Sequence, residues 1–123
     1  MKDDGPRSQS AYIAMRSNSI AVIIVAAGKG ERAGTGGNSL PKQYRPLGGT
    51  PVLSRTIAAF LALDAVTHVL PVIHADHAGL YADLGLADER LMPAVHGGAT
   101  RQASVLEGLK ALAPLQPARV LIQ

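Results

Sequence analysis

Apolar residues along this chain gather into short runs separated by stretches of helical spacing, a pattern that predicts alternating strands and helices. Residues 20–26 form a run rich in β-branched side chains, as expected of a parallel strand buried on both faces. Similar runs predict strands at 67–73, 91–95 and 119–123. The third of these four is weakened by Pro93, because proline cannot donate to a strand ladder.

Helices are predicted between these strands. Residues 50–61 fit a helix with Thr50 as N-cap and Pro51 at the first helical position. A short helix is expected over 76–84. Another is expected to open at 97–100, and its apolar stripe would consist of Val105, Leu106, Leu109 and Leu112.

This order predicts an α/β fold, with a Rossmann-like, doubly wound and mostly parallel sheet. Ligands of such sheets bind at the carboxyl ends of the strands. Residues 20–123 are expected to form the nucleotide-binding part of a single domain, because 123 residues suffice for one. Residues 1–19 are polar and turn-rich, which predicts a disordered leader that is neither a signal peptide nor a membrane span.

Composition narrows the possible functions. A hydrophobic fraction of 47% with 17% charged residues is typical of a globular protein. The absence of cysteine excludes disulfides, thiolate zinc sites and cysteine nucleophiles, and we expect a cytoplasmic protein. Aromatic residues amount to only 3%, and the basic residues form no continuous stripe, so we expect no nucleic-acid partner.

Positive charge is concentrated in the glycine-rich segment after the first predicted strand. Residues 28–45 hold a net charge of +3, equal to that of the whole chain. Glycines let the main chain approach an anion and expose N–H donors to it. The segment is therefore predicted to bind a polyphosphate, and its charged residues are Lys29, Glu31, Arg32, Lys42 and Arg45.

Two common phosphate-binding motifs fit this segment poorly. The dinucleotide fingerprint can almost be matched from Gly28 to Ala33, but about twenty proline-containing residues then separate the loop from the next helix. The Walker motif requires Gly-Lys-Ser/Thr, which residues 34–39 lack. A metal site at His74, Asp76 and His77 is also disfavoured, and we expect these histidines to be solvated at a helix start.

Three segments resemble the N-terminal motifs of the 2-C-methyl-D-erythritol 4-phosphate cytidylyltransferase family. They are Val-Ala-Ala-Gly-Lys-Gly-Glu-Arg at 25–32, Leu-Pro-Lys-Gln-Tyr at 40–44 and Gly-Gly-Ala-Thr-Arg-Gln-Ala-Ser-Val at 97–105. The resemblance implies transfer of a cytidylyl group from CTP to methylerythritol phosphate, with Mg²⁺ as cofactor and release of pyrophosphate. Within the same superfamily, ribitol 5-phosphate cytidylyltransferases share much of this pattern. A non-catalytic nucleotide-binding module is a further alternative.

The resemblance also implies roles for particular residues. Arg32 and Lys42 match the family's catalytic cations, which stabilise charge in the transition state. The nucleotide would be bound by small residues and one serine: Ala26, Ala27, Gly28, Gly30, Gly97, Gly98 and Ser104. Arg101 would either anchor its helix or line the site.

The resemblance further implies a longer protein. Family members continue past the position of Gln123 into a segment whose acid lies beside the metal, then into the sugar-phosphate site and a dimerising arm. We therefore expect an N-terminal fragment of a homodimer. In some bacteria the enzyme is fused to the cyclodiphosphate synthase of the same non-mevalonate isoprenoid pathway.

Overall fold

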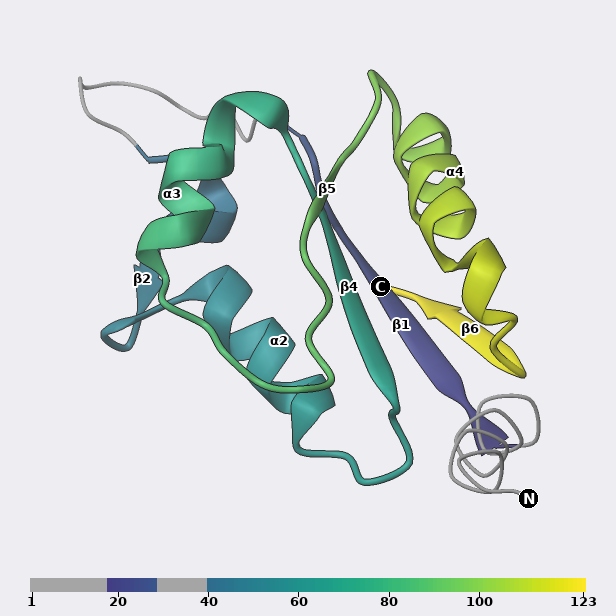
Figure 1. The fold of residues 1–123 in the computed structure, drawn as a ribbon. Coiled ribbons are helices and arrows are strands. Elements are labelled where there is room, and N and C mark those ends of the chain that lie inside the picture. Colours follow the sequence, from purple (N-terminus) through teal and green to yellow (C-terminus); the bar gives the residue numbers. More distant parts are fainter. Residues whose placement is uncertain (1–17, 29–39) are drawn as a thin grey trace.

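The described part of the chain contains a parallel sheet covered by helices on both faces. A computed structural model describes residues 18–28 and 40–123. Within them, four strands pair in the order β5-β4-β1-β6. Helices α2 (Val52–Leu61) and α3 (Ala78–Asp83) lie on one side of the sheet and α4 (Arg101–Leu112) on the other (Figure 1). The predicted α/β, doubly wound fold is confirmed.

The central strand fixes the topology. β1 (Ile20–Ala26) pairs in parallel with β4 (His68–Ile73) on one side and with β6 (Arg119–Ile122) on the other. β5 (Val95–His96) extends the sheet beyond β4. The chain therefore runs outward from β1 and then returns to its other side, which makes the β1–β6 boundary a topological switch point.

Short elements connect these strands and helices. A small antiparallel hairpin precedes α2, and 3-10 turns precede the hairpin, begin the α3 segment and follow α4. Their bounds are η1 (Lys42–Tyr44), β2 (Pro46–Leu47), β3 (Thr50–Pro51), η2 (Ala75–His77) and η3 (Ala113–Leu115).

One face of β1 packs beneath α2. Alternate side chains of the strand, from Val22 to Ala26, belong to a buried cluster with Leu53 and Ile57 of α2. Tyr44 from η1 joins this cluster and is 4% exposed. Burial of these side chains supplies the main free-energy gain that fixes α2 and η1 on the sheet.

The other face of β1 packs against α4, but not through the predicted stripe. Leu106 and Leu109 are 53% and 40% exposed, so that prediction is wrong for these two residues. The residues that α4 buries are spaced four apart: Ser104, Gly108 and Leu112. A Cβ on Gly108 would lie 2.9 Å from Cδ1 of Ile23, so glycine here lets the helix approach β1 closely without displacing the Ile23 side chain.

Two local predictions also differ from the structure. Thr50 pairs with Leu47 in the β2–β3 hairpin instead of capping α2, and Pro51 precedes the helix without a side-chain cap. The strand predicted at 91–95 is reduced to a single bridge between Leu91 and Val69, followed by the short β5. Pro93 accounts for the interruption, because it has no N–H to donate.

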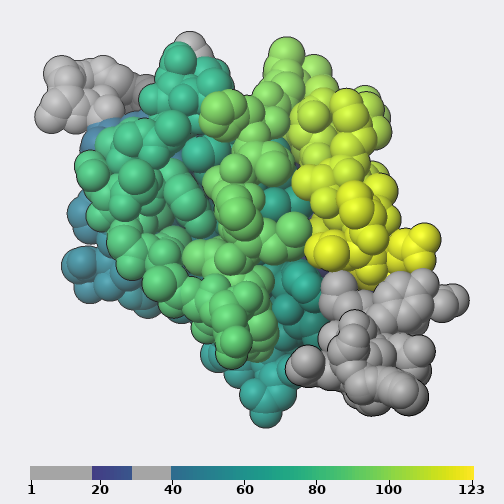
Figure 2. Space-filling model, in the orientation of Figure 1, coloured from purple at the N-terminus to yellow at the C-terminus, as the bar shows by residue number. Residues whose placement is uncertain are grey.

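Arg90 links the segment between α3 and β5 to the last residue of α2 and to the loop that follows α2. Its guanidinium donates to the carbonyl oxygens of Leu61, Leu63 (3.3 Å) and Val66 (3.1 Å). A cation suits this position, because the carbonyls at a helix C-terminus lack helical partners. Figure 2 shows the segment in green, lying across the front of the molecule between α3 and α4.

Candidate nucleotide site at the carboxyl ends of the strands

The carboxyl end of β1 forms the floor of the candidate site. Ala26 and Ala27 are 8% and 5% exposed, whereas Gly28 is open to solvent. Small side chains here leave the main chain accessible from above the sheet. All three residues were predicted to bind nucleotide, and they lie together at the switch point where doubly wound sheets bind ligands.

The turn η1 brings Gln43 against this floor, and Lys42 is the residue before it in the turn. In a 3-10 turn successive side chains point about 120° apart, because three residues complete one turn. Tyr44 points into the core, Gln43 donates from Nε2 to the carbonyl oxygens of Ala26 (2.9 Å) and Gly28 (3.2 Å), and Lys42 is exposed. Lys42 forms no ion pair with any residue that the structure describes. Its ammonium group is therefore available to an anion.

The start of α4 forms the opposite wall. Gly97 follows β5 and donates its N–H to the carbonyl oxygen of Ile73 at 2.8 Å. A Cβ on Gly97 would lie 2.4 Å from Oγ of Ser104 and 2.5 Å from Cβ of Ala27, so this approach requires glycine. These three residues, predicted from two separate motifs, are thus in mutual contact range.

Ser104 also shapes the loop before α4. Its buried Oγ accepts a hydrogen bond from the N–H of Gly98 at 3.1 Å. Thr100 caps the helix by accepting from the N–H of Ala103 at 3.0 Å. The positive end of the α4 dipole faces the site, and an anion would be stabilised there.

Two adjoining cavities occupy the space between these walls. One of about 350 Å³ is lined by Ala26, Gln43 and Thr56 among others, and one of about 260 Å³ by Ala27, Gly98 and Ser104 among others. Both are also lined by Val25, Gly28 and Arg101. Arg101 therefore lines the site, which resolves the two roles that the sequence left open.

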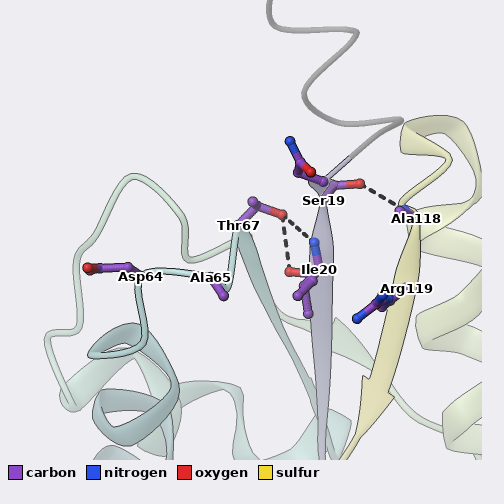
Figure 3. A pocket seen from close by; sticks show the side chains of 8 residues that line it. Ser19, Ile20, Asp64, Ala65, Thr67, Ala118 and Arg119 are labelled. Atoms are coloured by element: carbon purple, nitrogen blue, oxygen red, sulfur yellow. Dashed lines mark hydrogen bonds between the residues drawn. The ribbon is translucent and has the colours of Figure 1, made fainter.

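A cavity of the same volume lies at the opposite edge of the sheet. It measures about 350 Å³ and is lined by residues at the amino ends of β1, β4 and β6 (Figure 3). Its polar groups bond one another: Oγ of Ser19 accepts from the N–H of Ala118 at 2.8 Å. Oγ1 of Thr67 is within 3.0 Å of the N–H and 3.1 Å of the carbonyl oxygen of Ile20. Asp64 and Arg119 complete the lining, so the charges around this cavity are of both signs.

The two histidines after β4 contact neighbouring residues and each other. Nδ1 of His74 accepts from the N–H of Asp76 at 2.9 Å, and the His74 and His77 rings lie 5.0 Å apart. Across residues 18–28 and 40–123, no three potential protein ligands are grouped to hold a metal ion. His77 is 7% exposed and packs edge-on against Tyr44, so the prediction that it is solvated is wrong.

Some predicted residues lie outside the described part of the chain. Arg32 and Gly30 belong to residues 29–39, and most of the predicted leader belongs to residues 1–17, so these remain predictions from sequence. Gln43 is a site residue that sequence reasoning missed. The Pro-Lys-Gln-Tyr motif contained it, but only the fold reveals which carbonyls its amide reaches.

Small residues at the end of β1 and the N-terminus of α4 meet at the switch point of a doubly wound sheet, which is where α/β proteins of this class bind their ligands. The sequence model of the family "IspD: 2-C-methyl-D-erythritol 4-phosphate cytidylyltransferase" matches residues 20–123. The chain belongs to this family, whose members are nucleotidyltransferases.

Individual relatives agree with this assignment. The chain is 50% identical over 109 residues to the "Bifunctional enzyme IspD/IspF" of Bradyrhizobium diazoefficiens, an alignment that covers 87% of this chain and 26% of that protein. It is 53% identical over 108 residues to the protein of the same name from Bradyrhizobium sp. strain BTAi1, covering 86% and 26%. The chain thus spans about a quarter of the length of these curated relatives.

A solved structure shares the fold. The crystal structure of 4-diphosphocytidyl-2C-methyl-D-erythritol synthase from Anaerococcus prevotii matches with a TM-score of 0.64 and 29% identity. The match covers 80% of this chain and 39% of that one. No helix in the described residues is both long and apolar enough to span a bilayer.

Proposed function

We propose that the protein containing this chain transfers a cytidylyl group from CTP to 2-C-methyl-D-erythritol 4-phosphate. An oxygen of the methylerythritol phosphate bonds to the α-phosphorus of CTP, and the bond from that phosphorus to the β-phosphate oxygen breaks. CDP-methylerythritol and pyrophosphate are the products. Family membership over residues 20–123 supports this proposal, and so does the exposed Lys42 next to Gln43, whose amide bonds the end of β1.

The proposed chemistry needs positioned positive charge more than it needs a base. The attacking phosphate oxygen is already an anion, while negative charge grows on the equatorial oxygens and on the departing pyrophosphate. Lys42 is proposed to stabilise that charge together with Arg32. Gly28 and Gly30 are proposed to offer N–H groups to the β- and γ-phosphates.

The nucleoside is proposed to lie between the two walls of the site. Ala26 and Ala27 would lie under it, where their small side chains permit close approach. Gly97, Gly98 and Ser104 would face the cytosine. The close approach of Gly97 to both Ala27 and Ser104 supports a single nucleoside pocket built from both motifs.

The described residues do not by themselves fit a divalent cation. No carboxylate lines either cavity of the site in the described part of the chain. The Mg²⁺ requirement therefore remains a proposal in which the ligands are the CTP phosphates and an acid beyond Gln123, and no chemical step here depends on it.

Other proposals concern the whole protein. The curated relatives are named as bifunctional, and we propose fusion to a cyclodiphosphate synthase here as well. A homodimer and a cytoplasmic location are likewise proposed. Sequencing the gene beyond residue 123 tests the fusion, and light scattering of the whole protein tests the dimer.

An assay of the whole protein tests the reaction. CTP and methylerythritol phosphate are supplied with Mg²⁺, and pyrophosphate release is followed with and without EDTA. Release that requires both substrates and Mg²⁺ is the expected result. Release with ribitol 5-phosphate but not with methylerythritol phosphate would contradict the proposed substrate. CTP binding with neither release would indicate a non-catalytic module.

A further inference from the structure

Gln43 occupies an unusual position between the main chain of the site and its exposed lysine. Both of its hydrogen bonds come from Nε2, and both go to carbonyl oxygens at the end of β1, those of Ala26 and Gly28. These partners lie 17 and 15 residues away in the sequence. The amide therefore joins the two segments that build the anion site.

The hydrogen bond from Gln43 to the Ala26 carbonyl oxygen fixes the orientation of the peptide group between Ala26 and Ala27. A trans peptide directs its C=O and its N–H to opposite sides. When the carbonyl oxygen of Ala26 points to Gln43, the N–H of Ala27 in the same peptide is turned away from it. The second bond holds the Gly28 carbonyl in the same way, although glycine on its own permits many orientations.

The residues after Gln43 hold the turn in place, so that the Gln43 side chain can reach the end of β1 from one direction only. Tyr44 is buried beneath α2, and its N–H donates to the carbonyl oxygen of Pro41 at 2.9 Å. Nε of Arg45 donates to the carbonyl oxygen of Leu40 at 2.7 Å. With the turn held on both sides, the Gln43 amide sets how far the Lys42 Cα lies from the end of β1.

We propose that Gln43 is a positioning residue of this site, whose amide fixes the carbonyls of Ala26 and Gly28 and thereby holds Lys42 at the distance that the phosphates require. The inference rests on the proposed transferase function. It assigns to Gln43 no contact with the reacting atoms.

Three substitutions in the whole protein test the role. Gln43→Met keeps the length and removes the donor without adding charge. Gln43→Glu keeps the shape but turns an acceptor toward two carbonyl oxygens, and it regains one donor when protonated. Gln116→Glu is the matched control for charge, because Gln116 follows α4 and precedes β6, at the opposite edge of the sheet from the site.

The expected result is a fall in kcat with little change in stability. Gln43→Met and Gln43→Glu should each lower kcat about 10- to 100-fold at pH 8, the range in which small misplacements act. The Gln43→Glu deficit relative to wild type should shrink toward pH 6, because facing carbonyls favour the protonated acid, while that of Gln43→Met should not. KM for methylerythritol phosphate and Tm should match those of Gln116→Glu.

The proposal would be overturned if Gln43→Met had the kcat of the wild type. It would also be overturned if the loss of kcat only followed a loss of Tm, or if the loss of kcat in Gln43→Glu did not depend on pH. Absence of turnover in the wild type would instead count against the proposed function. In that event, titration calorimetry with inorganic tripolyphosphate decides the role of Gln43. Binding about tenfold weaker in Gln43→Met than in wild type supports it, and equal binding overturns it.

Discussion

The two edges of the parallel sheet hold cavities of equal volume, about 350 Å³ each, yet they differ in how their polar groups are used. At the amino edge, Ser19 and Thr67 satisfy main-chain groups of the adjoining strands. The amino-edge cavity is also lined by Asp64 and Arg119, which carry opposite charges. The charged side chain in the lining of the carboxyl-edge cavities is Arg101, with no carboxylate side chain beside it among the described residues. Volume alone therefore does not identify the site.

The difference follows from the chemistry of each edge. Buried polar groups are stable only when paired, so paired hydrogen bonds at the amino edge hold the strands together. At the carboxyl edge the guanidinium of Arg101 faces cavities without a lining carboxylate side chain, so it is available to an anion and contributes less to folding. Substitutions at the carboxyl edge should thus affect activity. Substitutions that remove paired hydrogen bonds elsewhere should affect stability.

The largest effect is expected at Lys42. In the whole protein, Lys42→Ala should lower kcat about 10²- to 10³-fold, the usual loss when one group that stabilises transition-state charge is removed. Tm should hardly change, because the side chain is exposed. Steady-state pyrophosphate release measures the effect. Lys110→Ala is the control, since Lys110 pairs only with Glu107 on the surface of α4. Turnover equal to that control would show that Lys42 has no catalytic role.

Arg90→Met should give the largest loss of stability. It removes donors to the carbonyl oxygen of Leu61, the last residue of α2, and to those of Leu63 and Val66 in the loop that follows, so we expect the free energy of unfolding to fall by about 2–3 kcal/mol. Urea denaturation measures this, and kcat of the folded protein should be unchanged. Arg55→Met is the control, because Arg55 makes one exposed bond, to the carbonyl oxygen of Leu47. If Arg90→Met and Arg55→Met lowered the free energy of unfolding equally, the hydrogen bonds of Arg90 would not have the stabilising role proposed for them.

Gly97→Ala tests the close contact between the two walls. The added Cβ would lie 2.4 Å from Oγ of Ser104, and we expect a loss of stability of about 1–3 kcal/mol together with a raised KM for CTP. Gly79→Ala in α3 is the control, because its Cβ would meet no atom within 4 Å. That variant should be slightly more stable, since alanine favours helix. An unchanged KM in Gly97→Ala would argue against a nucleoside pocket between the walls.

Tyr44→Phe should have the smallest effect. The buried hydroxyl of Tyr44 has no hydrogen-bond partner in the described part of the chain, so its removal should be neutral or stabilising by up to about 1 kcal/mol. A clear loss of stability would reveal a partner for the hydroxyl.

Tyr44 also predicts behaviour at high pH. Burial, with a smaller contribution from Tyr81, raises the pKa of Tyr44 from 10.0 to about 12. The unfolded chain therefore ionises first, and the stability that Tyr44 provides below pH 10 is lost as the pH rises toward 12. Tyr44→Phe should unfold with less pH dependence over that interval, as urea titrations at each pH would measure. An identical alkaline loss in the variant would assign the loss to other groups.

The sequence predicted a shared site for Ala27, Gly97 and Ser104, which lie in short motifs, and the fold brings these three residues together. Glycines after a buried strand, and a lysine after a proline, mark an anion loop by their types and order alone. Arg101 was left with two roles, because a helix N-terminus gives an arginine no fixed direction. Leu106 and Leu109 were misassigned to the core, because periodicity shows that a helix has an apolar stripe but not how close its partner comes.

The sequence by itself determined the order of the main strands and helices, because these depend on local periodicity and on the conformations that glycine and proline allow. Its three short motifs indicated the family. The tertiary structure decided that Ser104 and Gly108 face β1, that Gln43 reaches Ala26 and Gly28, and that Arg90 reaches the end of α2. The hydrogen bonds among these contacts join groups from 15 to 29 residues apart, and Gly108 lies against Ile23, which is much farther away in the sequence. Their geometry exists only after the sheet has brought its segments together.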